Sequence, residues 1–150
     1  TLDYTARFIQ LAEEINLGMP EFVVDKISAA LNGHKKPING SKVLVLGVSY
    51  KSDVADLRES PALDVIQLLT SRGAEAQFHD PYFDSVEIDG ASIPRTELTQ
   101  ESLNNADCVV VTAGHSFYDW QWIVDSTSLL VDTRNATNGI ESTNCEIHKL

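Results

Sequence analysis

The stretch VLVLGVSYKSDVADLRESP, residues 43–61, joins an apolar strand to a helix start through a long charged segment. Residues 43–48 form a continuous apolar run, which is expected of a strand buried on both faces of a parallel sheet. Ser60 and Pro61 predict the N-cap and the first position of a helix. The segment between them is about twice as long as the usual strand-to-helix loop of two to six residues. Because such loops at the carboxyl end of a buried strand often carry function, we expect the functional site here.

Strands and helices alternate along the rest of the chain. Further strands are predicted at 75–80, 107–112 and 128–132, with a short one near 86–88, and helices at 61–72, 99–104 and 119–125. This alternation predicts an α/β fold, a three-layer Rossmann-like parallel sheet with helices on both faces. With the usual strand order 3-2-1-4-5, strands 43–48 and 107–112 flank the ligand crevice. The segments 49–59, 113–118 and 133–138 then line one rim.

The N-terminal residues predict a helical extension of this sheet. Residues 1–31 read as two amphipathic helices interrupted at Gly18 and Pro20. Their apolar faces comprise Phe8, Leu11, Ala12 and Ile15 in the first helix and Phe22, Val23, Ile27, Ala30 and Leu31 in the second. The polar segment 32–41 reads as a linker, and 42–150 as the main domain. An uncovered apolar helix face also favours a dimerisation role for residues 1–31.

Composition limits the classes of function. The chain has 150 residues and a formal net charge of −11, which argues against a nucleic-acid partner. No apolar run is long enough to span a membrane, so we expect no membrane partner and a cytoplasmic location. The placement of Cys108 and Cys145 predicts neither a disulfide framework nor a metal site. Because the chain begins at Thr1, we expect it to be a piece of a longer protein.

Three cations are expected at the predicted rim. Lys51 and Arg58 lie on the long loop, and Arg134 follows strand 128–132. Together they suit a diphosphate, with arginine as a bidentate donor and lysine as a point charge. Alternatively, Arg58 pairs with Asp56 or Glu59 and only braces the loop.

The other polar and aromatic residues of the rim leave two roles open in each case. Tyr50 either stacks on a base or sugar or packs beside the strand end. His115 either contacts a ligand or is a polar surface residue. Asp80 stands where a Rossmann fold places its ribose-binding acid, but Gly47 is alone and no G-x-G-x-x-G follows the first strand. No activated nucleophile is recognisable, so the chain reads as the ligand-binding part of a larger protein.

Several motifs resemble one family. The segment GVSYKSDVADLRESPA, residues 47–62, closely resembles the C-terminal domain of the UDP-glucose/GDP-mannose dehydrogenase family, the nucleotide-sugar 6-dehydrogenases. AEEINLGMPEFVV (12–24), HDPYF (79–83) and VDTRNAT (131–137) also match the family. The YK pair, the H-x-x-Y element at 115–118 and DTRN look most like the branch acting on UDP-N-acetylhexosamines (UDP-N-acetylglucosamine or UDP-N-acetylmannosamine).

The resemblance implies an oxidation for which this chain holds only part of the machinery. An N-terminal domain, absent here, binds most of the NAD and supplies a cysteine nucleophile, and residues 1–31 are the end of the central, connecting helices. By position, Tyr50, Lys51 and Arg134 would contact the UDP-sugar, Arg58 would reach the NAD pyrophosphate, and Asp56, Glu59 and His115 would support them.

The resemblance therefore predicts no catalytic residue in this chain. We expect the chain to be inactive by itself. The full-length protein is expected to form a homodimer or higher oligomer. The alternative is a non-catalytic nucleotide-binding, regulatory or dimerisation module on the same fold.

Overall fold

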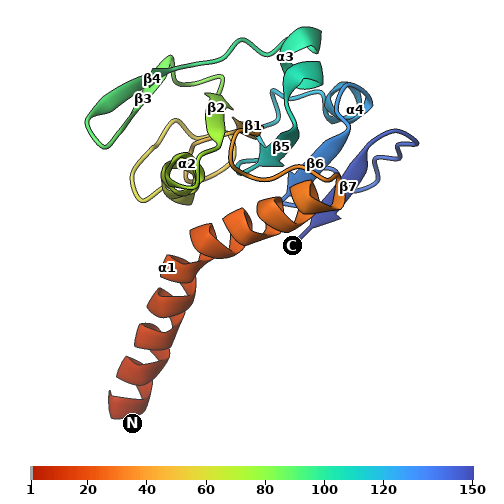
Figure 1. Cartoon of the computed structure of the whole chain (residues 1–150). Coiled ribbons are helices and arrows are strands. Elements are labelled where there is room, and N and C mark those ends of the chain that lie inside the picture. The colour runs from red at the N-terminus through yellow and green to blue at the C-terminus, as the bar shows by residue number, and fades with distance from the viewer. Residues whose placement is uncertain (1) are drawn as a thin grey trace.

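The computed structural model describes residues 2–150, with the side chains of 6–11 and 18–150. Four helices and seven strands are assigned within this range (Figure 1). In chain order they are α1 (Leu2–Gly33), β1 (Lys42–Leu46), α2 (Pro61–Ser71), β2 (Glu75–His79), β3 (Ser85–Ile88), β4 (Ala91–Pro94), α3 (Gln100–Asn105), β5 (Cys108–Val111), α4 (Trp120–Asp125), β6 (Leu129–Asp132) and β7 (Glu146–Lys149).

A parallel sheet forms the centre of the molecule. Its strand order is β2-β1-β5-β6-β7, and every neighbouring pair is parallel. The predicted α/β Rossmann-like fold is therefore confirmed. The expected order 3-2-1-4-5 is wrong at both edges: β3 pairs antiparallel with β4 in a separate hairpin, and β7 adds a strand beyond β6. The expected neighbours β1 and β5 do pair, so the predicted crevice lies where the chain changes direction across the sheet.

The β3–β4 hairpin forms a separate two-stranded sheet with a tight turn. Asp89 and Gly90 both have positive φ, 52° and 77°, as two-residue hairpin turns of type I′ require. A strand parallel to β2 would need a crossover connection of about a dozen residues or more. Only residues 80–84 separate β2 from β3, so β3 cannot extend the parallel sheet at that edge.

Helices cover both faces of the sheet and make three layers. Val43 and Val45 of β1 pack with α1 and α2, and the alternate residues Leu44 and Leu46 pack with α3 and α4. All four side chains have no solvent exposure, as predicted for a strand buried on both faces. Each such side chain stabilises the fold by about 1.5–3 kcal/mol relative to an exposed one.

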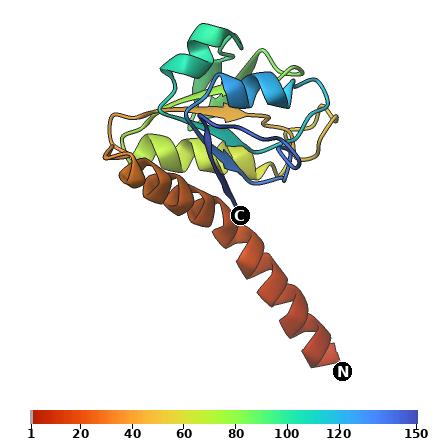
Figure 2. The same cartoon turned by 90° about the vertical axis from the view of Figure 1, so that its right-hand side faces the viewer.

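Helix α1 differs from the expected pair of helices. It runs from Leu2 to Gly33 without interruption, and Pro20 lies inside it. A proline inside a helix removes one backbone hydrogen bond and bends the axis, but packing can retain the helix. The helix is bent and its N-terminal half projects away from the sheet (Figures 1 and 2).

The two halves of α1 have different surroundings. Val24, Ile27 and Leu31 are fully buried against the sheet, whereas Phe8 and Leu11 are 67% and 54% exposed. The side chains of Ala12 and Ile15, predicted to share the face of Phe8 and Leu11, lie outside the described residues. Among the helices described, none is both long and apolar enough to cross a lipid bilayer.

The register of the sheet brings the strand ends together. Leu46 is the partner of His79 on β2 and of Val111 on β5, and Val111 is the partner of Asp132 on β6. Because these strands are parallel, the segments that follow them start at the same edge of the sheet. The loops after β1, β2, β5 and β6 therefore meet on one rim.

Candidate functional site

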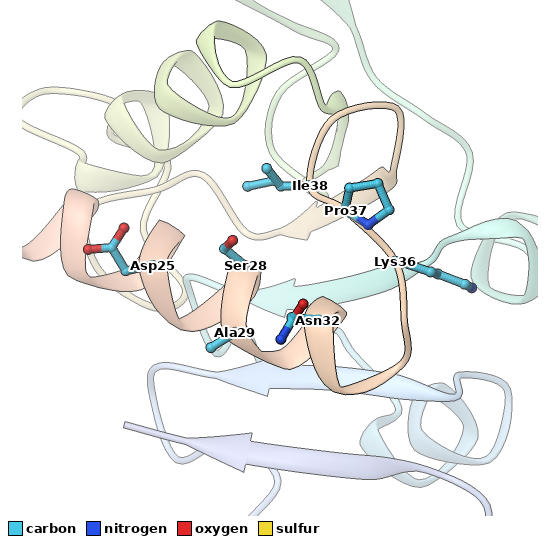
Figure 3. Close-up of a pocket in the computed structure, with 7 residues that line it drawn as sticks. All are labelled: Asp25, Ser28, Ala29, Asn32, Lys36, Pro37 and Ile38. Atoms are coloured by element: carbon cyan, nitrogen blue, oxygen red, sulfur yellow. The ribbon is translucent and has the colours of Figure 1, made fainter.

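A surface hollow of about 340 Å³ lies at the amino end of the sheet (Figure 3). It is lined by Asp25, Ser28, Ala29, Asn32, Lys36, Pro37 and Ile38. The Lys36 ammonium is paired with Asp107, which directly precedes β5, at 2.9 Å. Ligands in open parallel sheets bind beyond the carboxyl ends of the strands, so this hollow is at the wrong edge.

Gly47 starts the long loop at the other edge. Its φ of +83° is not that of an extended strand, so β1 ends at Leu46 and not at residue 48 as predicted. A Cβ atom at this position would lie 2.5 Å from the carbonyl oxygen of Ala113 in the loop after β5. The backbones of the two loops therefore approach too closely for any side chain, which explains the solitary glycine after the strand.

The base of the loop is closed by the helix start that the sequence predicts. The Ser60 hydroxyl donates a hydrogen bond to the Val48 carbonyl and accepts one from the backbone N–H of Ala62. Within the loop, the Tyr50 N–H donates to the Asp56 carbonyl over 2.9 Å. The N-cap of α2 thus fixes both the helix and the loop that leads into it.

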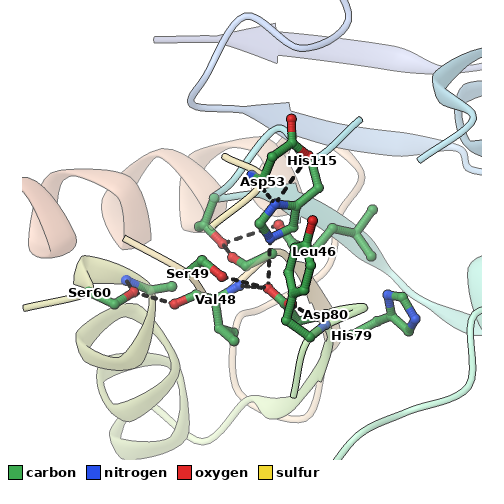
Figure 4. Close-up of polar contacts among 12 residues, drawn as sticks. Leu46, Val48, Ser49, Asp53, Ser60, His79, Asp80 and His115 are labelled. Carbon is green, nitrogen blue, oxygen red and sulfur yellow. Dashed lines mark hydrogen bonds and ion pairs between the residues drawn. The ribbon is translucent and has the colours of Figure 1, made fainter. Parts of the chain in front are cut away.

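A buried carboxylate joins the loops after β1, β2 and β5 (Figure 4). Asp80 has no exposure, and its Oδ2 accepts hydrogen bonds from the Val48 N–H at 2.8 Å and from His115 Nε2 at 2.9 Å. Its Oδ1 accepts from the Tyr82 N–H at 2.8 Å. Both oxygens are occupied by protein donors, so in this structure Asp80 serves the protein and not a ribose.

The middle of the loop is anchored on the segment after β5. The Asp53 N–H donates to His115 Nδ1 over 2.8 Å, and Asp53 Oδ1 accepts from the N–H and hydroxyl of Ser116 at 2.8 and 2.9 Å. The hydrogen bonds from Ser116, first from its N–H and then from its hydroxyl, lower the pKa of Asp53. The loop is therefore an ordered structure despite its length.

A second hollow, of about 520 Å³, opens on the outer side of this loop. It is lined by Tyr50, Lys51, Val54, Asp56, Arg58 and Glu59. These include most of the site residues predicted from the sequence. Tyr50 and Val54 are 44% and 45% exposed, so the hollow offers apolar surface beside charge.

Arg58 is bound to Asp56, as the bracing alternative proposed. Its Nε and Nη2 atoms each donate to one oxygen of the Asp56 carboxylate over 3.0 Å. This bidentate ion pair lowers the pKa of Asp56 and raises the pKa of Arg58. The Arg58 side chain is nevertheless 88% exposed, and its Nη1 has no acceptor among the described residues.

Arg134 lies beside the loop and does not line its hollow. The Arg134 Nε donates to the Thr112 carbonyl over 3.0 Å, and the Arg134 N–H donates to Asp132. A Cβ atom at Gly114 would lie 3.7 Å from Ser52 Oγ and 4.0 Å from Arg134 Cβ. The structure thus places both Arg134 and Ser52 of the loop next to Gly114.

His115 is fully buried, neither at the surface nor in the lining of the hollow. Sequence reasoning placed it in the rim but gave it no partner, and it missed Asp53 and the structural role of Asp80. The sequence signals for the Asp80–His115 pair are an acid at the end of β2 and a histidine after β5.

The two cysteines have the properties of structural thiols. Cys108 is buried in β5 and Cys145 is half-buried, and both are free. Burial raises the pKa of Cys108 to about 12 and that of Cys145 to about 11. Because a thiolate is the reactive form, neither thiol suits a nucleophile near neutral pH.

Comparison with known proteins identifies relatives for nearly the whole chain. The UDP-N-acetyl-D-mannosamine dehydrogenase of Methanococcus maripaludis is 35% identical over 113 residues, which are 75% of this chain and 25% of that protein. The enzyme of that name from Methanocaldococcus jannaschii is 36% identical over 141 residues, 89% of this chain and 30% of that protein.

A solved structure agrees with these relatives. The UDP-N-acetyl-mannosamine dehydrogenase of Staphylococcus aureus is 28% identical with a TM-score of 0.72, covering 98% of this chain and 34% of that one. The chain thus spans a quarter to a third of its relatives' length. The profile described as "UDP-glucose/GDP-mannose dehydrogenase family, UDP binding domain" matches residues 44–139, which contain the whole loop and its hollow. The chain belongs to this family and contains its UDP-binding domain.

Proposed function

We propose that this chain is the UDP-sugar-binding part of an NAD-dependent nucleotide-sugar 6-dehydrogenase. The observation that carries the proposal is the hollow at the carboxyl end of β1, lined by Tyr50, Lys51 and Arg58 within the family's UDP-binding domain. The reaction converts the C6 alcohol of the sugar to a uronic acid. This chain contributes binding and orientation, which hold C6 toward reactive groups supplied by the rest of the protein.

The polar lining suits the UDP part of such a substrate. Within the described part of the chain, the Tyr50 hydroxyl and the Lys51 ammonium make no hydrogen bond, so both can act on a ligand. Lys51 is exposed and supplies a compact positive charge for a phosphate, and Tyr50 supplies a ring face for the base or sugar. Arg134, across Gly114, is proposed to reach the same ligand.

Arg58 is the residue proposed to face the NAD. Its Asp56 partner holds the guanidinium plane while Nη1 and most of the side chain remain exposed, an arrangement that fits a pyrophosphate brought by another domain. Asp56 and Glu59 support this orientation. When bound, NAD would accept hydride from the sugar; the oxidation of an alcohol to an acid takes two such transfers and one water. Most of the NAD-binding surface is proposed to belong to the rest of the full-length protein.

We propose a UDP-N-acetylhexosamine as the substrate, because the relatives named above are called UDP-N-acetyl-mannosamine dehydrogenases. The exposed Phe8, Ile9 and Leu11 of α1 support self-association of the full-length protein. The free thiols Cys108 and Cys145 support a cytoplasmic location, where such thiols stay reduced.

Titration of this chain with UDP in a calorimeter tests the proposal. We expect measurable binding, weakened about tenfold or more by Lys51→Ala, because the charged contact to phosphate is lost. Lys42→Ala is the matched control, since Lys42 is an exposed lysine at the opposite end of β1. Absence of UDP binding by the wild-type chain, or equal affinities of the two variants, would contradict the proposal.

A further inference from the structure

His115 has a defined tautomer in this structure. Its Nδ1 accepts a hydrogen bond from the Asp53 N–H, so this atom carries a lone pair and no proton. Its Nε2 lies 2.9 Å from Asp80 Oδ2, an atom that also accepts from the Val48 N–H. The Nε2 atom therefore carries the proton and donates to Asp80. The carboxylate beneath the ring sets the tautomer that leaves Nδ1 as an acceptor.

The Nδ1 atom faces Asp53, which ties the middle of the loop to the segment after β5. Asp53 has a φ of +63°, a left-handed conformation that is uncommon for residues other than glycine and that aspartate adopts with the help of local hydrogen bonds. Its N–H is held by His115 and its carboxylate by Ser116. Asp53 stands between Lys51 and Val54, and both of these line the hollow.

The residues of the hollow depend on this attachment for their position. Within the described part of the chain, the side chains of Tyr50 and Lys51 have no hydrogen-bond partner of their own. Their positions are therefore set through the backbone of the loop, at its base and at Asp53. A loop that samples several conformations binds its ligand more weakly, in proportion to the fraction of molecules in the competent one.

We propose that His115 is a positioning residue for the UDP-binding loop: its Nδ1, kept as an acceptor by the buried Asp80, holds Asp53 and thereby presets Tyr50 and Lys51 for the ligand. This inference rests on the proposed function of the hollow. It assigns His115 a role without contact to the substrate, through a chain of hydrogen bonds from the end of β2 to the middle of the loop.

Two isosteric substitutions separate the positioning role from simple filling of space. His115→Asn places an amide oxygen near the Nδ1 position, which keeps the acceptor for Asp53 and loses the donor to Asp80. His115→Gln places an amide N–H near the Nε2 position, which keeps the donor to Asp80 and loses the acceptor. Both variants remove the ring from a fully buried site, so both are expected to lower the melting temperature.

Calorimetric affinity for UDP then distinguishes the two variants. We expect His115→Gln to bind about tenfold more weakly than the wild type, and His115→Asn to stay within about threefold of it. Equal affinities of the two variants would overturn the proposal. Failure of the wild-type chain to bind UDP would instead overturn the function proposed for the hollow.

A measurement on the unmodified chain covers the case in which a variant does not fold. Long-range ¹H–¹⁵N correlation spectra report which imidazole nitrogen carries the proton. We expect the proton of His115 on Nε2, with Nδ1 showing the shift of an unprotonated acceptor. A proton on Nδ1 would remove the acceptor for Asp53 and overturn the proposal.

Discussion

Replacing Asp80 with alanine removes the hydrogen-bond centre beneath the loop. The carboxylate accepts from the Val48 N–H, the Tyr82 N–H and His115 Nε2 at 2.8, 2.8 and 2.9 Å, and from the Ser49 hydroxyl over a longer 3.4 Å. Val48 and His115 have no solvent exposure, so alanine leaves these two closely bonded donors without an acceptor, each costing about 1–3 kcal/mol. The buried Ser49 hydroxyl loses only its longer contact of 3.4 Å. Tyr82 is 44% exposed, so water can replace its lost partner. We expect the free energy of unfolding to fall by about 2–5 kcal/mol.

Asparagine at the same position gives an intermediate result. Three of the four donors meet Oδ2, so the least costly orientation keeps the amide oxygen there and turns the NH₂ group toward the Tyr82 N–H. About one hydrogen bond is lost, at about 1–2 kcal/mol. The control is Asp84→Asn, which makes the same charge change at a side chain that is 95% exposed and should alter stability by less than about 0.5 kcal/mol.

Urea unfolding followed by tryptophan fluorescence measures all three variants. The expected order of destabilisation is Asp80→Ala, then Asp80→Asn, then Asp84→Asn, with melting temperatures lowered by about 3 °C for each kcal/mol. If both Asp80 variants unfold at the urea concentration of Asp84→Asn, the carboxylate does not organise the three loops and the reasoning is refuted.

Three further predictions follow from the backbone, the carboxylates and the thiols. Gly47→Ala should lose about 2–5 kcal/mol of unfolding free energy, from its positive φ and a clash, whereas Gly40→Ala, with a positive φ but open space, should lose about 1 kcal/mol; equal losses by urea titration would rule out the close approach. Burial alone raises the pKa of Asp132, but hydrogen bonds from the 133–137 turn outweigh it and lower the pKa overall. The stability that the Asp132 carboxylate contributes is therefore present above about pH 4 and is lost as pH falls through its depressed folded pKa. Asp132→Asn should make the melting temperature less dependent on pH in this acid range, and an unchanged pH dependence contradicts this. At pH 8 we expect Ellman's reagent to leave Cys108 unlabelled and to react slowly with Cys145 until guanidinium unfolds the chain, because their pKa values are raised to about 12 and about 11; rapid labelling of the native chain refutes it.

The strands that sequence reasoning found are those with an unambiguous apolar signal. Residues 43–48 and 108–111 are continuous apolar runs because their strands are buried on both faces. Strand β7 escaped notice because Glu146 and Lys149 are exposed at the edge of the sheet and only Ile147 carries an apolar side chain to the core. An edge strand with one apolar residue has no periodic pattern to detect.

Local helix signals succeeded at α2 and failed in α1. Ser60 and Pro61 mark a helix start whose capping hydrogen bond, from the Ala62 N–H to the Ser60 hydroxyl, is local, so the sequence alone indicates it. Gly18 and Pro20 are equally strong local breakers, yet α1 continues through them. The burial of Val24, Ile27 and Leu31 on the sheet stabilises the second half, and no local rule contains that contribution.

The charged residues of the site could be predicted, but the buried residues that hold them could not. Lys51 and Arg58 share one loop, so their proximity follows from the sequence. Asp80 and His115 are 35 residues apart and meet only because the strands before them lie on either side of β1. Their burial and pairing depend on the strand order, which local patterns leave open.

The most direct test of the account locates UDP on this chain by chemical-shift mapping. Amide resonances of the ¹⁵N-labelled chain are followed during a UDP titration. We predict that the largest shifts fall on residues 50–58 and 114–116, with none at the hollow of residues 25–38. Shifts confined to residues 25–38, or no shifts at any UDP concentration up to the millimolar range, would contradict the claim that the loop after β1 is the UDP site.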